Sequence, residues 1–328
     1  MRKTTALIAG LALLGGLTAC SGATTTTETG AVSCAPTVTS SAVSELSPGR
    51  ASAAVSATGD LGTAPKVDLP TPLFSKTTNV NTLIAGSGPT VTAGQPVILD
   101  ATILNGADGL LLQKTNYRGG GVNIITAGPS NIPALSQGLT CAKVGSRIAI
   151  VGSPEDSHSG AADPQNGIGE KDSFVYVVDV KEAFLAKANG ADQLPSNGMP
   201  AIVLLPDGTP GISMPSGSAP KRDSVSVLKK GAGETVKSGQ FVVVKFTAVG
   251  WRNKLVFDSS WANHQATILR IGTPSVSPGL NSALIGKSVG SQILAVLTPG
   301  SALVPDGSGK APINDSAVYV LDILGITG

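Results

Sequence analysis

The sequence predicts an α+β protein of two similar domains in tandem, each a mostly antiparallel β-sheet with one short α-helix. Two observations support this fold class. The phrase Gly-x-Gly-x-Thr-Val-x-x-Gly-Gln occurs at residues 86–95 and again at 231–240, an offset of 145 residues. Short runs of β-branched residues bounded by Gly, Pro and Asp follow each copy, and such runs are typical of strands. The chain has 328 residues, which suffices for about two domains.

The repeat keeps its register along the chain. Residues 144–146 and 289–291 both read Val-Gly-Ser, again 145 residues apart. Near the end of each copy, DSFVYVVDV at 172–180 matches DSAVYVLDI at 315–323 with an offset of 143 residues. A chance similarity between turn sequences would not hold its offset over most of a domain, so we interpret the repeat as a duplicated domain.

The second copy contains three expected strands and one expected helix. The strand candidates are 241–249, 291–299 and 317–326. The helix candidate is 278–286, because Pro278 suits a first helical turn and Gly286 suits the residue that follows a helix. The residues expected on its buried side are Leu280, Leu284 and Ile285. Segments rich in Pro, Gly and Ser, at 193–200 and 215–223, separate the two copies.

Composition excludes several classes of function. Only 13% of the residues are charged, and the formal net charge is +2. No run of Lys or Arg exceeds two residues and aromatic residues make up 3% of the chain, so we expect no nucleic-acid partner. The two histidines, His158 and His264, lie in loop sequences. Glu155, Asp156 and His158 could bind a metal, but we interpret 154–160 as a solvated loop and expect neither a metal nor a cofactor.

The first residues have the pattern of a secretory signal. Arg2 and Lys3 precede an uncharged, mostly apolar run from Ala6 to Leu17 that is short for a membrane span. The run is followed by Thr-Ala-Cys, and Leu-Thr-Ala-Cys at Cys20 resembles the lipobox of bacterial lipoproteins, in which the cysteine thiol is acylated and becomes the first mature residue. The alternative is an ordinary cleaved signal followed by a chance cysteine.

We therefore expect a lipoprotein signal peptide at residues 1–19 and a lipid-anchored flexible tether at 20–57. The tether is rich in Thr, Ser, Gly and Ala and has few large apolar residues to bury. Lipidation at Cys20 would hold the protein on the extracytoplasmic face of the bacterial cell membrane. Two further cysteines remain in that oxidising compartment, and we expect a disulfide between Cys34 and Cys141. The alternative is two free thiols.

Several motifs follow one another within residues 224–326. They are VVVKFTAVGW at 242–251, VFDSS at 256–260, Pro-Gly-Leu at the helix candidate, and a Val-Gly-Ser strand that ends in Thr-Pro. In this order they resemble the FKBP-type peptidyl-prolyl cis–trans isomerases. The resemblance implies two tandem FKBP-like domains, the second of which isomerises Xaa–Pro bonds of unfolded or secreted polypeptides. Such catalysis needs no nucleophile or metal, because a dry apolar pocket favours the twisted amide over the planar one.

The resemblance also implies a substrate pocket in the second unit. Phe257 and Asp258 match the family's wall phenylalanine and pocket aspartate, and Ser277 falls where the family presents a backbone N–H. The differing positions are Phe246 for a usual Tyr, Tyr319 for a usual Phe, Leu280 for a Trp, Leu303 for a flap Tyr, and Thr267 for a further Phe. The implied site residues are Phe246, Phe257, Asp258, Val276, Ser277, Leu280, Leu303 and Tyr319. Because rings are missing from this pocket, we expect the activity to be weak.

The first unit has lost the most specific motif. At the offset of 145 residues, Leu112 and Gln113 stand in place of Phe257 and Asp258, so we expect a degenerate, non-catalytic copy. The expected segments are 58–190 for this copy, 191–223 for a linker and leading strand, and 224–328 for the isomerase domain. Two alternatives to an isomerase remain open. One is a non-catalytic FKBP-like module that binds or chaperones other proteins, and the other is a purely architectural pair of β domains.

Overall fold

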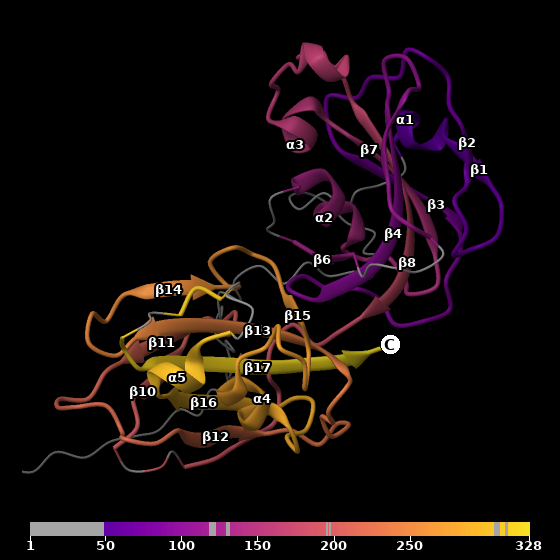
Figure 1. The fold of residues 1–328 in the computed structure, drawn as a ribbon. Helices are drawn as coiled ribbons and strands as arrows, with labels where there is room; N and C mark the ends of the chain where they lie inside the picture. Colours follow the sequence, from indigo (N-terminus) through magenta and orange to yellow (C-terminus); the bar gives the residue numbers. More distant parts are fainter. Residues whose placement is uncertain are drawn as a thin grey trace, which may run out of the picture. The chain divides into compact units, whose positions relative to one another are not determined.

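Two antiparallel sheets, each with a short helix packed on one face, make up most of the described chain (Figure 1). The computed structural model describes residues 49–117, 123–128, 132–194, 196, 198–304, 309–311 and 314–328. No helix within these ranges is long and apolar enough to cross a membrane.

The first sheet has the strand order β3-β7-β8-β4-β5, and β6 also pairs with β4. Its strands are β3 (Asn79–Ile84), β4 (Pro96–Asn105), β5 (Leu111–Lys114), β6 (Ile124–Thr126), β7 (Arg147–Gly152) and β8 (Phe174–Ala183). Helix α2 (Pro133–Leu139) packs its buried Leu135 and Leu139 in one core with Ile150 and Tyr176. Helix α3 (Pro154–His158) and a 3₁₀ turn (Pro164–Asn166) lie between β7 and β8.

The second sheet has the strand order β14-β13-β17-β16-β12-β9, and β15 also pairs with β13. Its strands are β9 (Ala191–Asp192), β12 (Ser224–Lys230), β13 (Phe241–Gly250), β14 (Val256–Ser259), β15 (Thr267–Arg270), β16 (Gln292–Leu297) and β17 (Ala317–Thr327). Helix α4 (Pro278–Leu284) lies between β15 and β16, and α5 (Pro299–Ala302) follows β16. The mostly antiparallel sheets with few helices confirm the expected α+β class.

The strand order β3-β7-β8-β4-β5 of the first sheet corresponds to the order β12-β16-β17-β13-β14 of the second. The pairing of residues across the strands also follows the offsets of the sequence repeat. Ile150 faces Tyr176 in the first sheet, and Ala295 faces Tyr319 in the second. Ile150 and Ala295 are 145 positions apart, and Tyr176 and Tyr319 are 143 positions apart. These are the offsets between the repeated phrases of the sequence. Equivalent stretches of the repeat therefore form equivalent strands.

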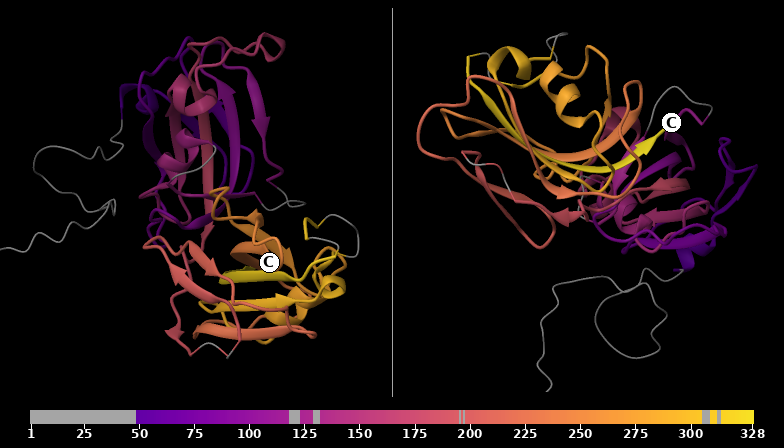
Figure 2. Two further views of the ribbon diagram at one scale, coloured as in Figure 1. Left: turned by 90° about the vertical axis from the view of Figure 1, so that its left-hand side faces the viewer. Right: turned by 90° about the horizontal axis from the view of Figure 1, so that it is seen from below.

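Each sheet also has a two-stranded hairpin on the face opposite its helix. The hairpins are β1 (Ser56–Thr58) with β2 (Lys66–Asp68), and β10 (Ala201–Leu204) with β11 (Pro210–Ser213). Val67 packs against Val151 and Val175 of the first sheet. Ile202 and Ile212 pack in the core that contains Val296, Val318 and Val320 of the second sheet. Figure 2 shows the helices of the second sheet on one face and the β10–β11 hairpin on the other.

Some segments differ in detail from what the sequence predicts. Residues 191–223, expected as a linker and leading strand, include β9, β10 and β11. Helix α1 (Arg50–Ala53) lies within the segment expected as a tether. The helix expected at 278–286 ends at Leu284, and Ile285 adopts extended backbone angles beyond it. Ile285 is therefore turned away from the buried side and is 42% exposed, so its expected burial is wrong.

Candidate active site

A β-bulge between β13 and β14 brings two consecutive side chains to one face of the second sheet. Val256 faces Val249 and Asp258 faces Ala248, so Phe257 is the extra residue without a direct partner on β13. Directly facing residues point to the same side of a sheet, and a bulge redirects the extra side chain. Ala248 lies in the core beneath α4, and Phe257 packs against that same core. Phe257 and Asp258 therefore lie on the helix-covered face together.

Three aromatic rings meet on this face. The ring centroid of Tyr319 lies 5.9 Å from that of Phe257, in an edge-to-face arrangement, and 6.3 Å from that of Phe246. These are favourable ring geometries, worth about 0.5–1.5 kcal/mol per pair beyond the burial of apolar area. Tyr319 is 7% exposed, whereas the two phenylalanines are half-buried. The rings thus line a partly open apolar surface.

Six of the eight expected site residues belong to this one apolar cluster. They are Phe246, Phe257, Val276, Leu280, Leu303 and Tyr319. Ser277 is fully buried at the start of α4, where its Oγ accepts a hydrogen bond of 3.3 Å from the backbone N–H of Leu280. Within the described residues, the backbone N–H of Ser277 itself donates to no acceptor.

Asp258 forms an ion pair that the sequence did not indicate. Lys310 Nζ lies 3.1 Å from Asp258 Oδ1, and the two side chains are 62% and 24% exposed. The pair is partly solvated and is worth about 0–1 kcal/mol. Lys310 comes 52 positions after Asp258 and belongs to no recognisable motif, so nothing in the sequence indicates this ion pair.

The hydroxyl of Tyr319 remains neutral in this setting. Burial raises the pKa of Tyr319 well above its ordinary value, and the negative charge of Asp258 raises that pKa further. The hydroxyl has no hydrogen-bond partner among the described residues. The site thus combines apolar walls, one rim carboxylate, one backbone N–H and one phenolic donor.

Comparison with known proteins identifies the part of the chain that contains this site. Residues 232–324 match the family model for FKBP-type peptidyl-prolyl cis-trans isomerases. These residues form an FKBP-type domain. The FKBP-type domain contains all eight expected site residues, although the comparison does not test their individual roles, which stay predictions.

Individual relatives are more distant from the chain. A probable FK506-binding protein of Corynebacterium glutamicum is 27% identical over 115 residues, which cover 35% of this chain and 96% of the relative. The structure of FkpA from Escherichia coli is similar at 21% identity and a TM-score of 0.30, over 40% of this chain and 53% of FkpA. The three FKBP domains of wheat FKBP73 are similar at 16% identity and a TM-score of 0.33, over 76% and 94% of the two chains. Both TM-scores are low, so the assignment rests on the family match. The chain also spans only about half the length of FkpA.

The first sheet has a bulge at the position that corresponds to Phe257, but different side chains occupy it. Leu111 faces Leu104 and Gln113 faces Ile103, which leaves Leu112 as the extra residue of an equivalent bulge. Gln113 thus replaces the rim carboxylate, and Leu112 replaces the ring. Among the described residues, no group of three or more His, Cys, Asp or Glu is placed to bind a metal.

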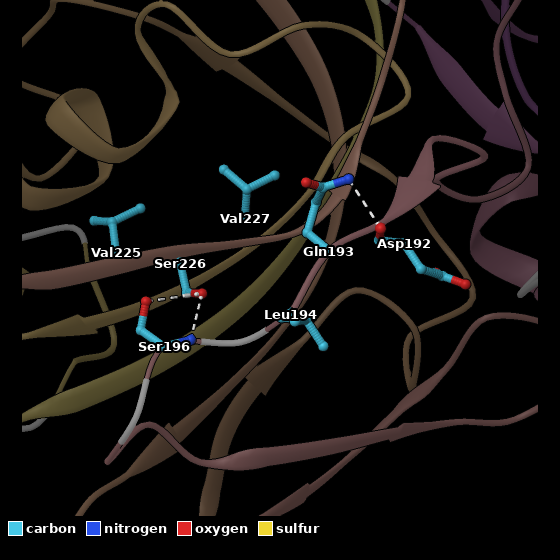
Figure 3. Close-up of a pocket in the computed structure, with 7 residues that line it drawn as sticks. All are labelled: Asp192, Gln193, Leu194, Ser196, Val225, Ser226 and Val227. Carbon is cyan, nitrogen blue, oxygen red and sulfur yellow. Dashed lines mark hydrogen bonds between the residues drawn. The ribbon is translucent and has the colours of Figure 1, made fainter.

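The pocket in Figure 3 lies apart from the FKBP-type site. It is lined by Asp192, Gln193, Leu194, Ser196, Val225, Ser226 and Val227, beside the edge of β12. Its internal hydrogen bonds join Gln193 Nε2 to the Asp192 carbonyl oxygen at 2.9 Å and Ser196 N–H to Ser226 Oγ at 3.2 Å. It shares no residue with the aromatic cluster and contains no ring. The pocket and the aromatic residues are therefore two separate features of the domain.

The expected cysteine chemistry is only partly within the described residues. Cys141 is disulfide-bonded. Its expected partner Cys34 lies outside the described residues, and so does Cys20, the expected lipidation site. The pairing of Cys34 with Cys141 and the lipid on Cys20 therefore stay predictions.

Proposed function

We propose that the FKBP-type domain isomerises Xaa–Pro bonds in unfolded or secreted polypeptides. The observation that carries this proposal is the grouping of Phe246, Phe257 and Tyr319 around an apolar surface with Asp258 at its rim. Rotation about a peptide bond crosses a barrier of about 18–20 kcal/mol because the planar amide is stabilised by resonance. A twisted amide has lost that resonance and much of its polarity, so an apolar surface binds it better than the planar form.

The activity we propose is weak. Leu280 and Leu303 occupy positions where the resemblance implies aromatic side chains, and both pack in the pocket cluster. Each aliphatic replacement removes apolar wall and ring contacts worth about 0.5–1.5 kcal/mol. Since 1.4 kcal/mol is about a factor of ten in rate, two such losses lower turnover noticeably.

We further propose that the first sheet is a degenerate FKBP-like domain without catalytic activity. Its strand order, its cross-strand register and its bulge at Leu112 correspond to those of the second sheet. It lacks the ring and the carboxylate that meet in the FKBP-type domain. The duplicated fold therefore supports one catalytic and one binding or structural unit.

The proposed location is the extracytoplasmic face of the bacterial cell membrane. The support is the apolar signal and the lipobox-like sequence at Cys20. Two or more acyl chains provide stable anchoring where a single chain does not. In cells, changing Cys20 to Ser should yield an unprocessed or shed protein. Normal maturation and membrane fractionation of that variant would refute the anchor.

The aliphatic side chains at positions 280 and 303 also favour a second function. A module that binds unfolded polypeptides in this groove needs an apolar surface and hydrogen-bonding groups, but it does not need to favour the twisted amide. The aliphatic side chains of Leu280 and Leu303 fit that simpler role. A purely architectural role has less support, because it gives no reason for an aspartate and three rings to meet on one face.

A refolding assay limited by proline isomerisation separates these functions. The Asp258→Ala variant should slow catalysis, and the matched variant Gln113→Ala in the first sheet should not. Both side chains are at least partly solvated, so neither change should unfold the protein. Full activity in Asp258→Ala would remove the pocket from the mechanism. A wild-type protein that binds unfolded chains without catalysing isomerisation would establish the binding module instead.

A further inference from the structure

Tyr319 is flanked by small side chains on both neighbouring strands. It is in the middle of β17, where it faces Ala248 on β13 and Ala295 on β16. In the first sheet the equivalent Tyr176 faces Ile103 and Ile150. Facing side chains on adjacent strands are close neighbours on one side of a sheet. Tyr319 thus faces two small side chains on the neighbouring strands, whereas Tyr176 faces two isoleucines.

The hydroxyl of Tyr319 is a donor without a partner among the described residues. The side chain is 93% buried, since it is 7% exposed, and its hydroxyl has no partner among the described residues. The ring neighbours Phe246 and Phe257 offer no polar atom. The oxygen is absent from the fully buried, unpartnered polar atoms, so it reaches the accessible surface. An acceptor on a bound molecule can therefore reach this hydroxyl in place of water.

The protonated hydroxyl of Tyr319 requires a hydrogen-bond acceptor as its partner. Asp258 lies near enough to act on Tyr319 electrostatically, yet no hydrogen bond joins the two residues. A neutral phenol beside a carboxylate serves as a donor. A prolyl amide has no N–H, so the polar atom it presents at the bond that rotates is an acceptor. Donor and acceptor are therefore complementary.

We propose that the Tyr319 hydroxyl donates a hydrogen bond to the carbonyl oxygen of an Xaa–Pro amide bound among Phe246, Phe257 and Tyr319. This assignment rests on the proposed function, because it takes a prolyl peptide as the ligand. The carbonyl oxygen is present in the planar and in the twisted amide. The hydrogen bond therefore strengthens binding of both forms, and it acts mainly on Kd and KM rather than on kcat.

The first experiment observes the hydroxyl directly. The chain has three tyrosines, Tyr117, Tyr176 and Tyr319, so labelling tyrosine Cζ with ¹³C gives three NMR signals. The full-length protein, solubilised in detergent, is titrated with a short Ala-Leu-Pro-Phe peptide. We expect the Tyr319 signal to shift with saturation while the other two remain in place. A peptide that binds without moving the Tyr319 signal would overturn the assignment.

The second experiment measures the contribution of the hydroxyl. Tyr319→Phe keeps the ring and removes the donor, and Tyr176→Phe makes the same change in the first sheet. A neutral hydrogen bond corresponds to about a 3- to 10-fold change in binding. We expect Tyr319→Phe to raise Kd for the peptide and to lower kcat/KM by the same 3- to 10-fold factor. Tyr176→Phe should change neither quantity.

The outcomes separate this assignment from the proposed function. An active wild-type protein whose Tyr319→Phe variant keeps its Kd and kcat/KM would overturn the hydrogen bond and leave the isomerase intact. A loss of kcat/KM with unchanged Kd would place the interaction in the twisted form alone and overturn the carbonyl assignment. A wild-type protein that binds the peptide through Tyr319 without isomerising it would refute the catalytic function and support the hydrogen bond. Absence of both binding and catalysis would refute both.

Discussion

Arg147 and Asp179 form a fully buried ion pair in the first sheet, with 2.6 Å between Nε and Oδ1. The Arg147 guanidinium also donates to the backbone carbonyl oxygens of Gly59, Asp60 and Thr63. At the equivalent place in the second sheet, Gln292 Nε2 donates to Asp322 Oδ1 at 2.7 Å. A charged arginine in one sheet thus corresponds to a neutral amide in the other.

This difference predicts unequal costs for equivalent substitutions. Arg147→Met should lower the free energy of unfolding of the first domain by about 3–5 kcal/mol, because it leaves Asp179 buried without its counter-ion. Gln292→Leu should cost about 1–3 kcal/mol, because Asp322 still accepts a hydrogen bond of 2.8 Å from Ala188 N–H. Urea denaturation of the two variants tests the prediction. A cost for Arg147→Met no greater than that for Gln292→Leu would contradict it.

Lys245 predicts a dependence of stability on pH. Burial lowers the pKa of Lys245 from 10.5 to about 8, although Asp322 and Asp207 oppose the shift. Its Nζ donates to the Ala186 carbonyl oxygen at 3.2 Å and lies 4.5 Å from the centre of the Trp261 ring. Since the pKa is lower in the folded state, the contribution of Lys245 to stability is fully present above the unfolded pKa and is lost as pH falls through about 8.

We therefore expect the free energy of unfolding to gain a rising component between pH 8 and pH 10.5. Lys245→Met should abolish this component, and Lys171→Met, at an exposed lysine, should retain it. Urea midpoints measured across this pH range provide the test. A component that survives in Lys245→Met would assign it to another group.

The alanines beside Tyr319 predict a way to close the pocket without breaking the fold. Ala295→Ile introduces the side chain that the first sheet has at Ile150. We expect isomerase activity to fall about tenfold or more, because the added atoms occupy the space beside the ring. The cost in stability should be about 1–3 kcal/mol, as for other overpacked sites.

The reverse change in the first sheet serves as the control. Ile150→Ala should cost about 2–5 kcal/mol through the cavity that it creates, and it should leave the activity unchanged. Activity measured beside thermal unfolding distinguishes the two sheets. An Ala295→Ile variant with wild-type activity would show that the pocket lies elsewhere.

The disulfide at Cys141 predicts a specific peptide map. We expect Cys34 and Cys141 to appear in one cross-linked peptide under non-reducing mass spectrometry, and to separate after reduction. Cys34→Ser should remove that peptide and destabilise the first domain by up to about 4–5 kcal/mol, because the bridge closes a loop of more than 100 residues. A cross-link between Cys141 and Cys20 would instead contradict both the pairing and the lipid anchor.

Much of the fold was predictable because the repeated residues have strong preferences for particular backbone conformations. The Gly-rich turns, the β-branched strands and Pro278 each fix nearby backbone, so strands and α4 lie where the sequence placed them. The six apolar site residues also come together as expected. The roles of those residues remain untested by the fold.

Other features depend on contacts between distant residues and left no local signal. The β10–β11 hairpin comes from a segment rich in Pro and Gly, and its burial depends on the valines of a sheet that is completed more than 100 residues later. Lys310 reaches Asp258 from a different loop. The difference between Ala295 and the equivalent Ile150 is visible in the sequence. Its meaning depends on knowing that each residue faces a tyrosine on the neighbouring strand.

The bulge at Leu112 gives the first sheet a backbone on which a ring and a carboxylate could be placed side by side. A bulge that is missing must be created by inserting a residue and shifting a strand, whereas a bulge already in place needs only new side chains. Leu112→Phe and Gln113→Asp would supply the ring and the carboxylate, and Ile103→Ala with Ile150→Ala would clear the space beside Tyr176. Ala101 corresponds to Phe246, so these four substitutions would still leave the first sheet one ring short of the arrangement in the second sheet, without any change of backbone.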